Sequence, residues 1–118
     1  VVASSTQESA PSVLDGNPST AWKANKGEYI TFALENNASP NNIAIAWKEK
    51  SKDAKFEIQL SGGGGQFLAA SDVYKRQVEA TNELTNYRFK GTTASDIRIV
   101  ITSGNASISE VKIKELKN

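Results

Sequence analysis

Short runs in which apolar residues recur at every second position are distributed along this chain. In residues 56–60, for example, Phe56, Ile58 and Leu60 fall on one side and Glu57 and Gln59 on the other. Because successive side chains of a β-strand point to opposite faces, this alternation predicts strands with one buried face. Comparable runs lie at residues 29–34, 43–47, 87–89, 97–101 and 108–113. The apolar residues expected inside are Ile30, Phe32, Leu34, Ile43, Ile45, Trp47, Tyr87, Phe89, Ile97, Ile99, Ile101, Val111 and Ile113.

Turn-forming residues separate these runs, and no long helical pattern is present. The series therefore predicts an all-β fold, an antiparallel sandwich or barrel. The glycines at residues 62–65 have strand-like flanks, so we interpret them as a hairpin loop; an interdomain linker is the alternative. The chain of 118 residues fits one domain with one core, spanning residues 1–118.

The chain has no cysteine and no histidine. This excludes thiol chemistry, serine or cysteine triads and histidine-based zinc sites. Its carboxylates are scattered among turns and strand faces without an evident pair, so we expect no enzyme activity. A net charge of +1 is too balanced for a general nucleic-acid binder. No apolar run approaches the roughly 20 residues of a membrane span. We therefore expect neither nucleic acid nor a membrane as a partner.

Residues 71–80 depart from the alternating pattern and are rich in charge. One interpretation is an exposed edge strand or loop. The other starts from the resemblance of SDVYKRQ, residues 71–77, to a translated sequencing-adapter fragment. In that case the segment was never selected for this fold, and we expect it to pack poorly. Burial of Val73 and Tyr74 would argue against that origin.

The polar loop VLDGNPSTAWKA, residues 13–24, has two interpretations. It is either a surface turn with Trp22 filling the core, or part of a calcium site. Calcium takes six to eight oxygen ligands, as a rule. Asp15 and Thr20 offer such oxygens, and Gly16 permits a sharp turn. One carboxylate would bind a divalent ion weakly, so a second acid would have to come from elsewhere.

Several motifs occur in a recognisable order: ASS, LDGNPSTAW, GEYITFAL, FEIQLS with a glycine-rich turn and an aromatic, IRIVI and ISEVKI. The series resembles the coagulation-factor type C domain, also called the discoidin domain. Within that superfamily it resembles the family-32 carbohydrate-binding modules of bacterial polysaccharide-degrading enzymes. Residues 43–61 are most similar to modules attached to alginate lyases. The resemblance covers nearly the whole chain, with residues 70–80 as its poorest part.

The resemblance implies a jelly-roll β-sandwich that carries a structural calcium ion. The implied ligands are Ser12, Asp15, Asn17, Thr20, Ser109 and Glu110. Glu110 would supply the second carboxylate, which the loop lacks. Such an ion would tie the early loop to the last strand, so its role would be structural.

The resemblance also implies a sugar site in loops at one end of the sandwich. Lysines in residues 47–55 and 22–26 would suit an acidic glycan. The candidates are Lys23, Asn25, Lys48, Lys50, Lys52 and Asn105. The alternative is a solvated strand face, because alternating lysine and acidic residues often protect a strand edge. Trp22 and Trp47 are expected in the core rather than at the ligand.

Two departures from related modules argue against a strong sugar site. The hairpin after residues 43–47 has lysine where relatives usually have arginine, and the loop before the last strand is short and lacks an aromatic. The expected function is a non-catalytic module that targets a linked enzyme to an acidic polysaccharide such as alginate. The alternative is a structural or interaction domain that has lost sugar binding. We expect a secreted, monomeric domain excised from a larger multidomain enzyme.

Overall fold

The computed structural model describes residues 2–3, 21–35, 38–62, 66–79 and 83–115. Almost all regular structure there is β-strand, as the alternating runs predict. The strands are β1 (Val2–Ala3), β2 (Trp22–Asn25), β3 (Tyr29–Ala33), β4 (Asn42–Lys50), β5 (Lys55–Ser61), β6 (Leu68–Ala69), β7 (Arg76–Gln77), β8 (Leu84–Arg88), β9 (Asp96–Ser103) and β10 (Asn105–Lys114). A 3₁₀ turn, η2 (Ser71–Val73), lies between β6 and β7. In the described residues, no helix has the length and apolar character that crossing a membrane requires.

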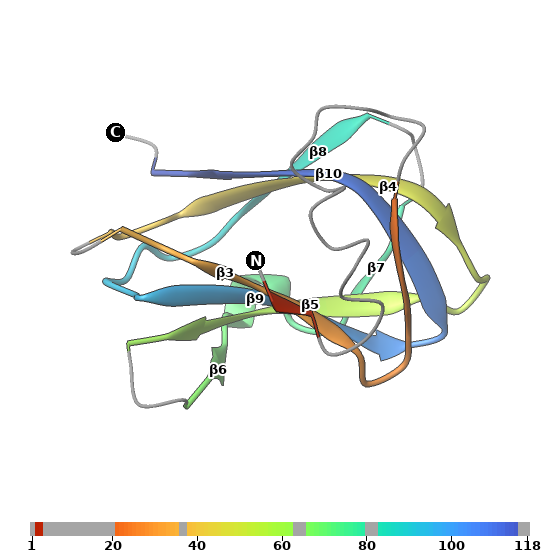
Figure 1. The fold of residues 1–118 in the computed structure, drawn as a ribbon, viewed down its shortest axis with the longest axis horizontal. Helices are drawn as coiled ribbons and strands as arrows, with labels where there is room; N and C mark the ends of the chain where they lie inside the picture. The colour runs from red at the N-terminus through yellow and green to blue at the C-terminus, as the bar shows by residue number, and fades with distance from the viewer. Residues whose placement is uncertain (1, 4–20, 36–37, 63–65, 80–82, 116–118) are drawn as a thin grey trace.

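The strands form two antiparallel sheets packed face to face, a jelly-roll sandwich (Figure 1). Sheet A has the order β1-β3-β9-β5-β6, with β7 also paired to β5. Sheet B has the order β2-β10-β4-β8. In Figure 1 the β10 and β4 strands lie above β3, β9 and β5, and the core fills the space between them. The all-β sandwich expected from the sequence is thus confirmed.

Alternation along the strands places one apolar set in this core. Ile97, Ile99 and Ile101 of β9 are fully buried, as are Ile43 and Ile45 of β4. The pairing of β9 with both β3 and β5 makes it the central strand of sheet A. Leu34, Leu60 and Ile113 pack at the edge of the core and are only partly buried.

Both tryptophans belong to the core, as expected, since Trp22 and Trp47 are 0% exposed. β4 departs from simple alternation, because Ala44 and Ala46 on its other face are also buried. Glu57 departs too. It lies on the outer face of β5, as predicted, yet only 9% of its surface is exposed. β5 has β9 on one side and β6 and β7 on the other, so its neighbours cover this side chain.

The hairpin interpretation of the glycine-rich segment is confirmed by the pairing of Leu60 with Leu68 across it. In residues 71–79, Val73 and Val78 are fully buried, whereas Tyr74 is 54% exposed. The expectation of poor packing is therefore wrong for the two valines. β7 pairs with the start of β5, so this part of the segment forms an exposed edge strand.

Candidate functional site

Three connections meet at one end of the sandwich, on the right in Figure 1. They are the turn between β2 and β3, the turn between β4 and β5, and the turn between β9 and β10. The Ser51 amide donates to the Asn105 carbonyl oxygen at 2.8 Å, and the Asn105 amide donates to Ser51 Oγ at 2.9 Å. The Gly27 amide donates to the Ile101 carbonyl oxygen at 2.7 Å. These bonds fix the three turns relative to one another.

Gly104 allows the turn between β9 and β10 to lie close to the turn between β4 and β5. Its φ of 66° lies in the left-handed region, which side chains disfavour. A Cβ atom at this position would collide with Ser51 Oγ and would lie 2.6 Å from Asp53 Oδ1. The Ser51 hydroxyl also donates to Asp53 Oδ1 at 2.9 Å. Neither Ser51 nor Gly104 was among the residues predicted to matter, although a glycine in a short turn between two apolar runs is a usable signal.

All of the residues expected to bind sugar except Lys48 gather at this end. Asn105 pairs with Asn25, and Ser107 pairs with both Lys23 and Glu49. Lys52 lies in the β4–β5 turn, which Ser51 ties to Asn105. Together with the neighbouring Lys26 and Lys50, these residues form what we call the lysine rim: Lys23, Asn25, Lys26, Lys50, Lys52 and Asn105.

The members of the lysine rim differ in how freely they face solvent. Lys23, Lys26 and Lys52 are exposed and make no ion pair in the part of the chain that the structure describes. The Lys50 ammonium group instead donates to the Ser51 carbonyl oxygen at 3.4 Å. Lys48 is half-buried and already interacts within the chain, so we leave it out of the rim. Both tryptophans near the rim are buried, so neither can stack against a ligand there.

The calcium ligands implied by the resemblance are only partly described. Ser12, Asp15, Asn17 and Thr20 lie outside the described residues. Ser109 is buried on β10 and its hydroxyl donates to the Ala46 carbonyl oxygen at 3.2 Å. The Glu110 side chain is 30% exposed, and its carboxylate forms an ion pair with Lys112 Nζ at 3.9 Å. The described residues alone contain no group of three or more acidic, histidine or cysteine side chains suited to a metal.

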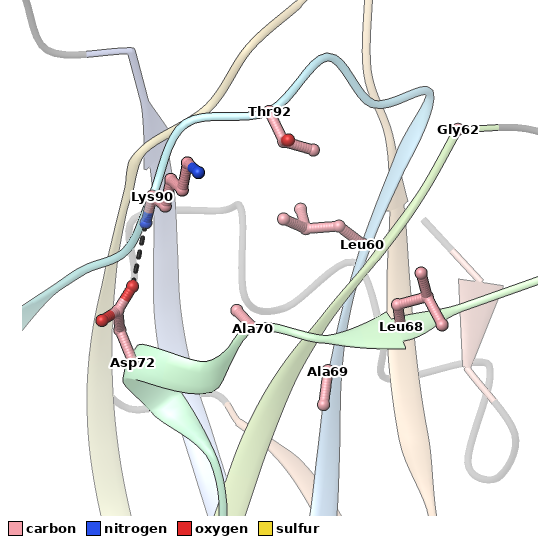
Figure 2. A pocket seen from close by; sticks show the side chains of 8 residues that line it. All are labelled: Leu60, Gly62, Leu68, Ala69, Ala70, Asp72, Lys90 and Thr92. Carbon is pink, nitrogen blue, oxygen red and sulfur yellow. Dashed lines mark hydrogen bonds between the residues drawn. The ribbon is translucent and has the colours of Figure 1, made fainter.

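A separate cavity of about 270 Å³ lies at the far end of β5 (Figure 2). Its wall is mainly apolar, and Asp72 Oδ2 accepts a hydrogen bond from the Lys90 amide at 3.0 Å beside it. The lining residues are Leu60, Gly62, Leu68, Ala69, Ala70, Asp72, Lys90 and Thr92. None of them belongs to the lysine rim, and none is an aromatic residue against which a sugar ring could stack.

Comparisons with known proteins identify the class to which this fold and rim belong. The F5/8 type C domain model matches residues 1–114. The carbohydrate-binding module CBM32 of AlyQ, solved in complex with 4,5-unsaturated mannuronic acid, is 32% identical with a TM-score of 0.75, over 91% of this chain and 86% of that one. The family 32 module of Clostridium perfringens NanJ, in complex with galactose, is 23% identical with a TM-score of 0.76, over 96% and 90%. The comparison with curated proteins gave no match.

These matches define a β-sandwich carbohydrate-binding module. The chain belongs to the F5/8 type C, or discoidin, family and is a CBM32-type member of it.

Proposed function

We propose that this domain is a non-catalytic module that holds a covalently linked polysaccharide-degrading enzyme on an acidic polysaccharide such as alginate. The main support is the lysine rim, where Lys23, Lys26 and Lys52 are exposed without an ion pair in the described residues. Ammonium groups attract uronate carboxylates, and the amides of Asn25 and Asn105 suit sugar hydroxyls. Lysine is a point charge without the bidentate geometry of arginine, so each contact contributes modestly.

The sugars bound by related modules include an acidic one and a neutral one. The AlyQ module was solved with an unsaturated mannuronic acid, whereas the NanJ module was solved with galactose. The related modules therefore take sugars of different charge on one fold. The exposed lysines of the rim favour an acidic sugar as the ligand of this chain.

Attachment to an enzyme would make a weak site useful. A shallow polar site buries little apolar surface, so its affinity for a single ligand is modest. Linkage to a catalytic domain raises the local concentration of that domain on the polymer. A chain containing CBM32 and alginate lyase domains of AlyQ is 34% identical with a TM-score of 0.73, over 88% of this chain and 28% of that one. Polymeric substrates of this kind are extracellular, so we propose a secreted location and a monomeric module.

A structural calcium ion is part of the proposal. The Glu110 carboxylate on the last strand would complete a ligand set with Ser12, Asp15, Asn17, Thr20 and Ser109. Carboxylate, hydroxyl and carbonyl oxygens are the ligands that calcium prefers. When bound, the ion would tie the loop of residues 12–20 to β10 and stabilise the fold.

A structural or interaction domain without sugar binding is the second candidate. It is favoured by the burial of both tryptophans and by the lack of an exposed aromatic ring among the described residues of the lysine rim. Such a domain would dock against its neighbour in the full-length protein and would bind no glycan.

Affinity electrophoresis separates the two candidates. The domain is run through gels that contain alginate, pectin or a neutral glucan, with albumin as the non-binding control. Retardation by alginate or pectin that weakens with added salt supports the acidic-glycan module. Equal mobility in all three gels would overturn it and favour the interaction domain.

A further inference from the structure

Arg98 on the outer face of sheet A is held between two aromatic rings. Its guanidinium carbon lies 3.8 Å from the centre of the Tyr29 ring and 3.7 Å from that of the Phe67 ring. Two rings this close to one carbon atom fit only on opposite faces of the planar guanidinium group. Tyr29 begins β3 and Phe67 directly precedes β6, so the contact joins the two sides of the sheet.

A hydrogen bond fixes the remaining freedom of the Arg98 side chain. Its Nε–H donates to Thr31 Oγ1 at 2.9 Å, and Thr31 is the residue that pairs with Arg98 on β3. Arginine has five N–H donors, so the two terminal nitrogens keep theirs available. Within the described chain the Arg98 side chain makes no other hydrogen bond and no ion pair with a carboxylate. The guanidinium group is therefore held in one orientation, and its two terminal nitrogens remain available to a ligand.

The residues around Arg98 restrict which ligands can bind there. Gln59 pairs directly with Arg98 on the β5 side, and its side-chain amide has no hydrogen-bond partner in the described part of the chain. Two acidic residues share this outer face, Glu57 and Asp96, and Asp96 Oδ2 accepts a hydrogen bond from Ser95 Oγ. A bare anion such as phosphate would meet their repulsion. A ligand that carries one carboxylate together with hydroxyl donors can offset this repulsion, because its hydroxyl groups donate hydrogen bonds to Asp96.

We propose that Tyr29, Thr31, Gln59, Phe67 and Arg98, here called the arginine clamp, form a second subsite that takes a uronic-acid residue of a polysaccharide. The sugar carboxylate accepts hydrogen bonds from the terminal nitrogens of Arg98, in the paired geometry that suits arginine. The sugar hydroxyls bond to Gln59 and Asp96. This inference rests on the proposed acidic-glycan function.

The position of the clamp relative to the lysine rim supports this role. Tyr29 follows immediately after the β2–β3 turn that carries Lys26, and the Ile101 amide donates to the Glu28 carbonyl oxygen at 3.0 Å. A chain bound at the rim can therefore continue along the outer face of sheet A. Two weak subsites on one polymer strengthen overall binding through effective concentration.

Heteronuclear NMR of the 118-residue domain tests the clamp. The domain is titrated with a mannuronic-acid trisaccharide, with neutral mannotriose and with inorganic phosphate. We expect the trisaccharide alone to shift the Arg98 Nε–H and Gln59 side-chain signals. Gln59→Ala, which removes no internal hydrogen bond, should weaken this binding several-fold, and Arg98→Lys by at least about tenfold, since charged hydrogen bonds are strong. Unfolding curves of both variants report whether the fold is retained.

The outcomes distinguish the clamp from the rim. Shifts at Lys23, Asn25 and Asn105 with none at Arg98 and Gln59 overturn the clamp and leave the proposed function standing. Shifts at Arg98 and Gln59 in the wild type, with a smaller Arg98 shift in Gln59→Ala, support the clamp. Equal shifts with phosphate and trisaccharide overturn the assignment to a sugar. No shift with any ligand overturns both the clamp and the acidic-glycan function.

Discussion

Trp47 Nε1 donates a hydrogen bond to the Tyr87 hydroxyl, 3.1 Å away, inside the core. Both residues also contact Phe56 of the opposite sheet, with ring centres 4.9 and 5.0 Å apart. The bond satisfies the only polar atom of a fully buried tryptophan and links β4 to β8. The ring contacts with Phe56 pack sheet B against sheet A.

Removal of the hydroxyl by Tyr87→Phe should leave the indole N–H buried without a partner. An unsatisfied buried donor costs about 1–3 kcal/mol, so we expect the free energy of unfolding to fall by that amount. Urea unfolding followed by circular dichroism measures it. Tyr74→Phe, at a position that is 54% exposed, is the matched control and should change little. An unchanged stability of Tyr87→Phe would mean that the bond is not formed.

Because Tyr87 is buried, we also expect the domain to lose stability at alkaline pH. Burial raises the pKa of Tyr87 above its ordinary value of 10.0, partly offset by the hydrogen bond from Trp47. The unfolded chain releases this proton at lower pH than the folded chain does. Stability is therefore complete below pH 10.0 and declines as pH rises toward the higher folded-state pKa. Unfolding measured across this range should show a smaller decline for Tyr87→Phe than for the wild type; equal declines would contradict the prediction.

Gly104→Ala should destabilise the turn between β9 and β10. The left-handed backbone costs a side chain about 1–2 kcal/mol, and the contact with Ser51 and Asp53 adds about 1–3 kcal/mol of overpacking. Gly27→Ala is the matched control, because its φ is 86° but nothing lies within 4 Å of the added Cβ. Chemical denaturation should therefore rank Gly104→Ala as clearly the less stable. The reverse order would contradict the turn geometry.

Lys23→Ala and Lys52→Ala should each weaken binding to alginate by a few-fold. Each removes one exposed charge from the lysine rim, so the dependence of affinity on salt should also become shallower. Lys114→Ala removes an exposed charge at the opposite end of β10 and should leave binding unchanged. Affinity electrophoresis at several salt concentrations measures all three variants. Equal losses in all three would indicate general charge attraction instead of a rim.

A chelator should lower the melting temperature if calcium stabilises the fold. Ligand that binds only the folded state adds about 3–4 kcal/mol at concentrations of 100–1,000 times its dissociation constant. Glu110→Gln should lower the melting temperature and abolish the response to chelator. Differential scanning calorimetry with and without calcium measures both effects. An unchanged melting temperature of the wild-type domain in the presence of chelator would contradict the proposed calcium ion.

The sequence by itself determined the class of fold. Alternation in the runs around Ile30, Ile45, Ile58 and Ile99 specifies which side of each strand is apolar, and two such faces can be buried only against each other. The same pattern assigned Tyr87 and Trp47 to the core. The ordered motifs specified the discoidin family, which the match over residues 1–114 confirms.

Only the tertiary structure decided which distant residues meet. Strand order and register depend on packing over the whole chain, so alternation alone could not pair Asn25 with Asn105 or place Phe67 against Arg98. Exposure is likewise a property of neighbours: Glu57 is covered because β5 has partners on both sides, and Lys50 bonds to Ser51. Local periodicity tells which face a side chain is on, whereas the sheet around it determines what covers that face.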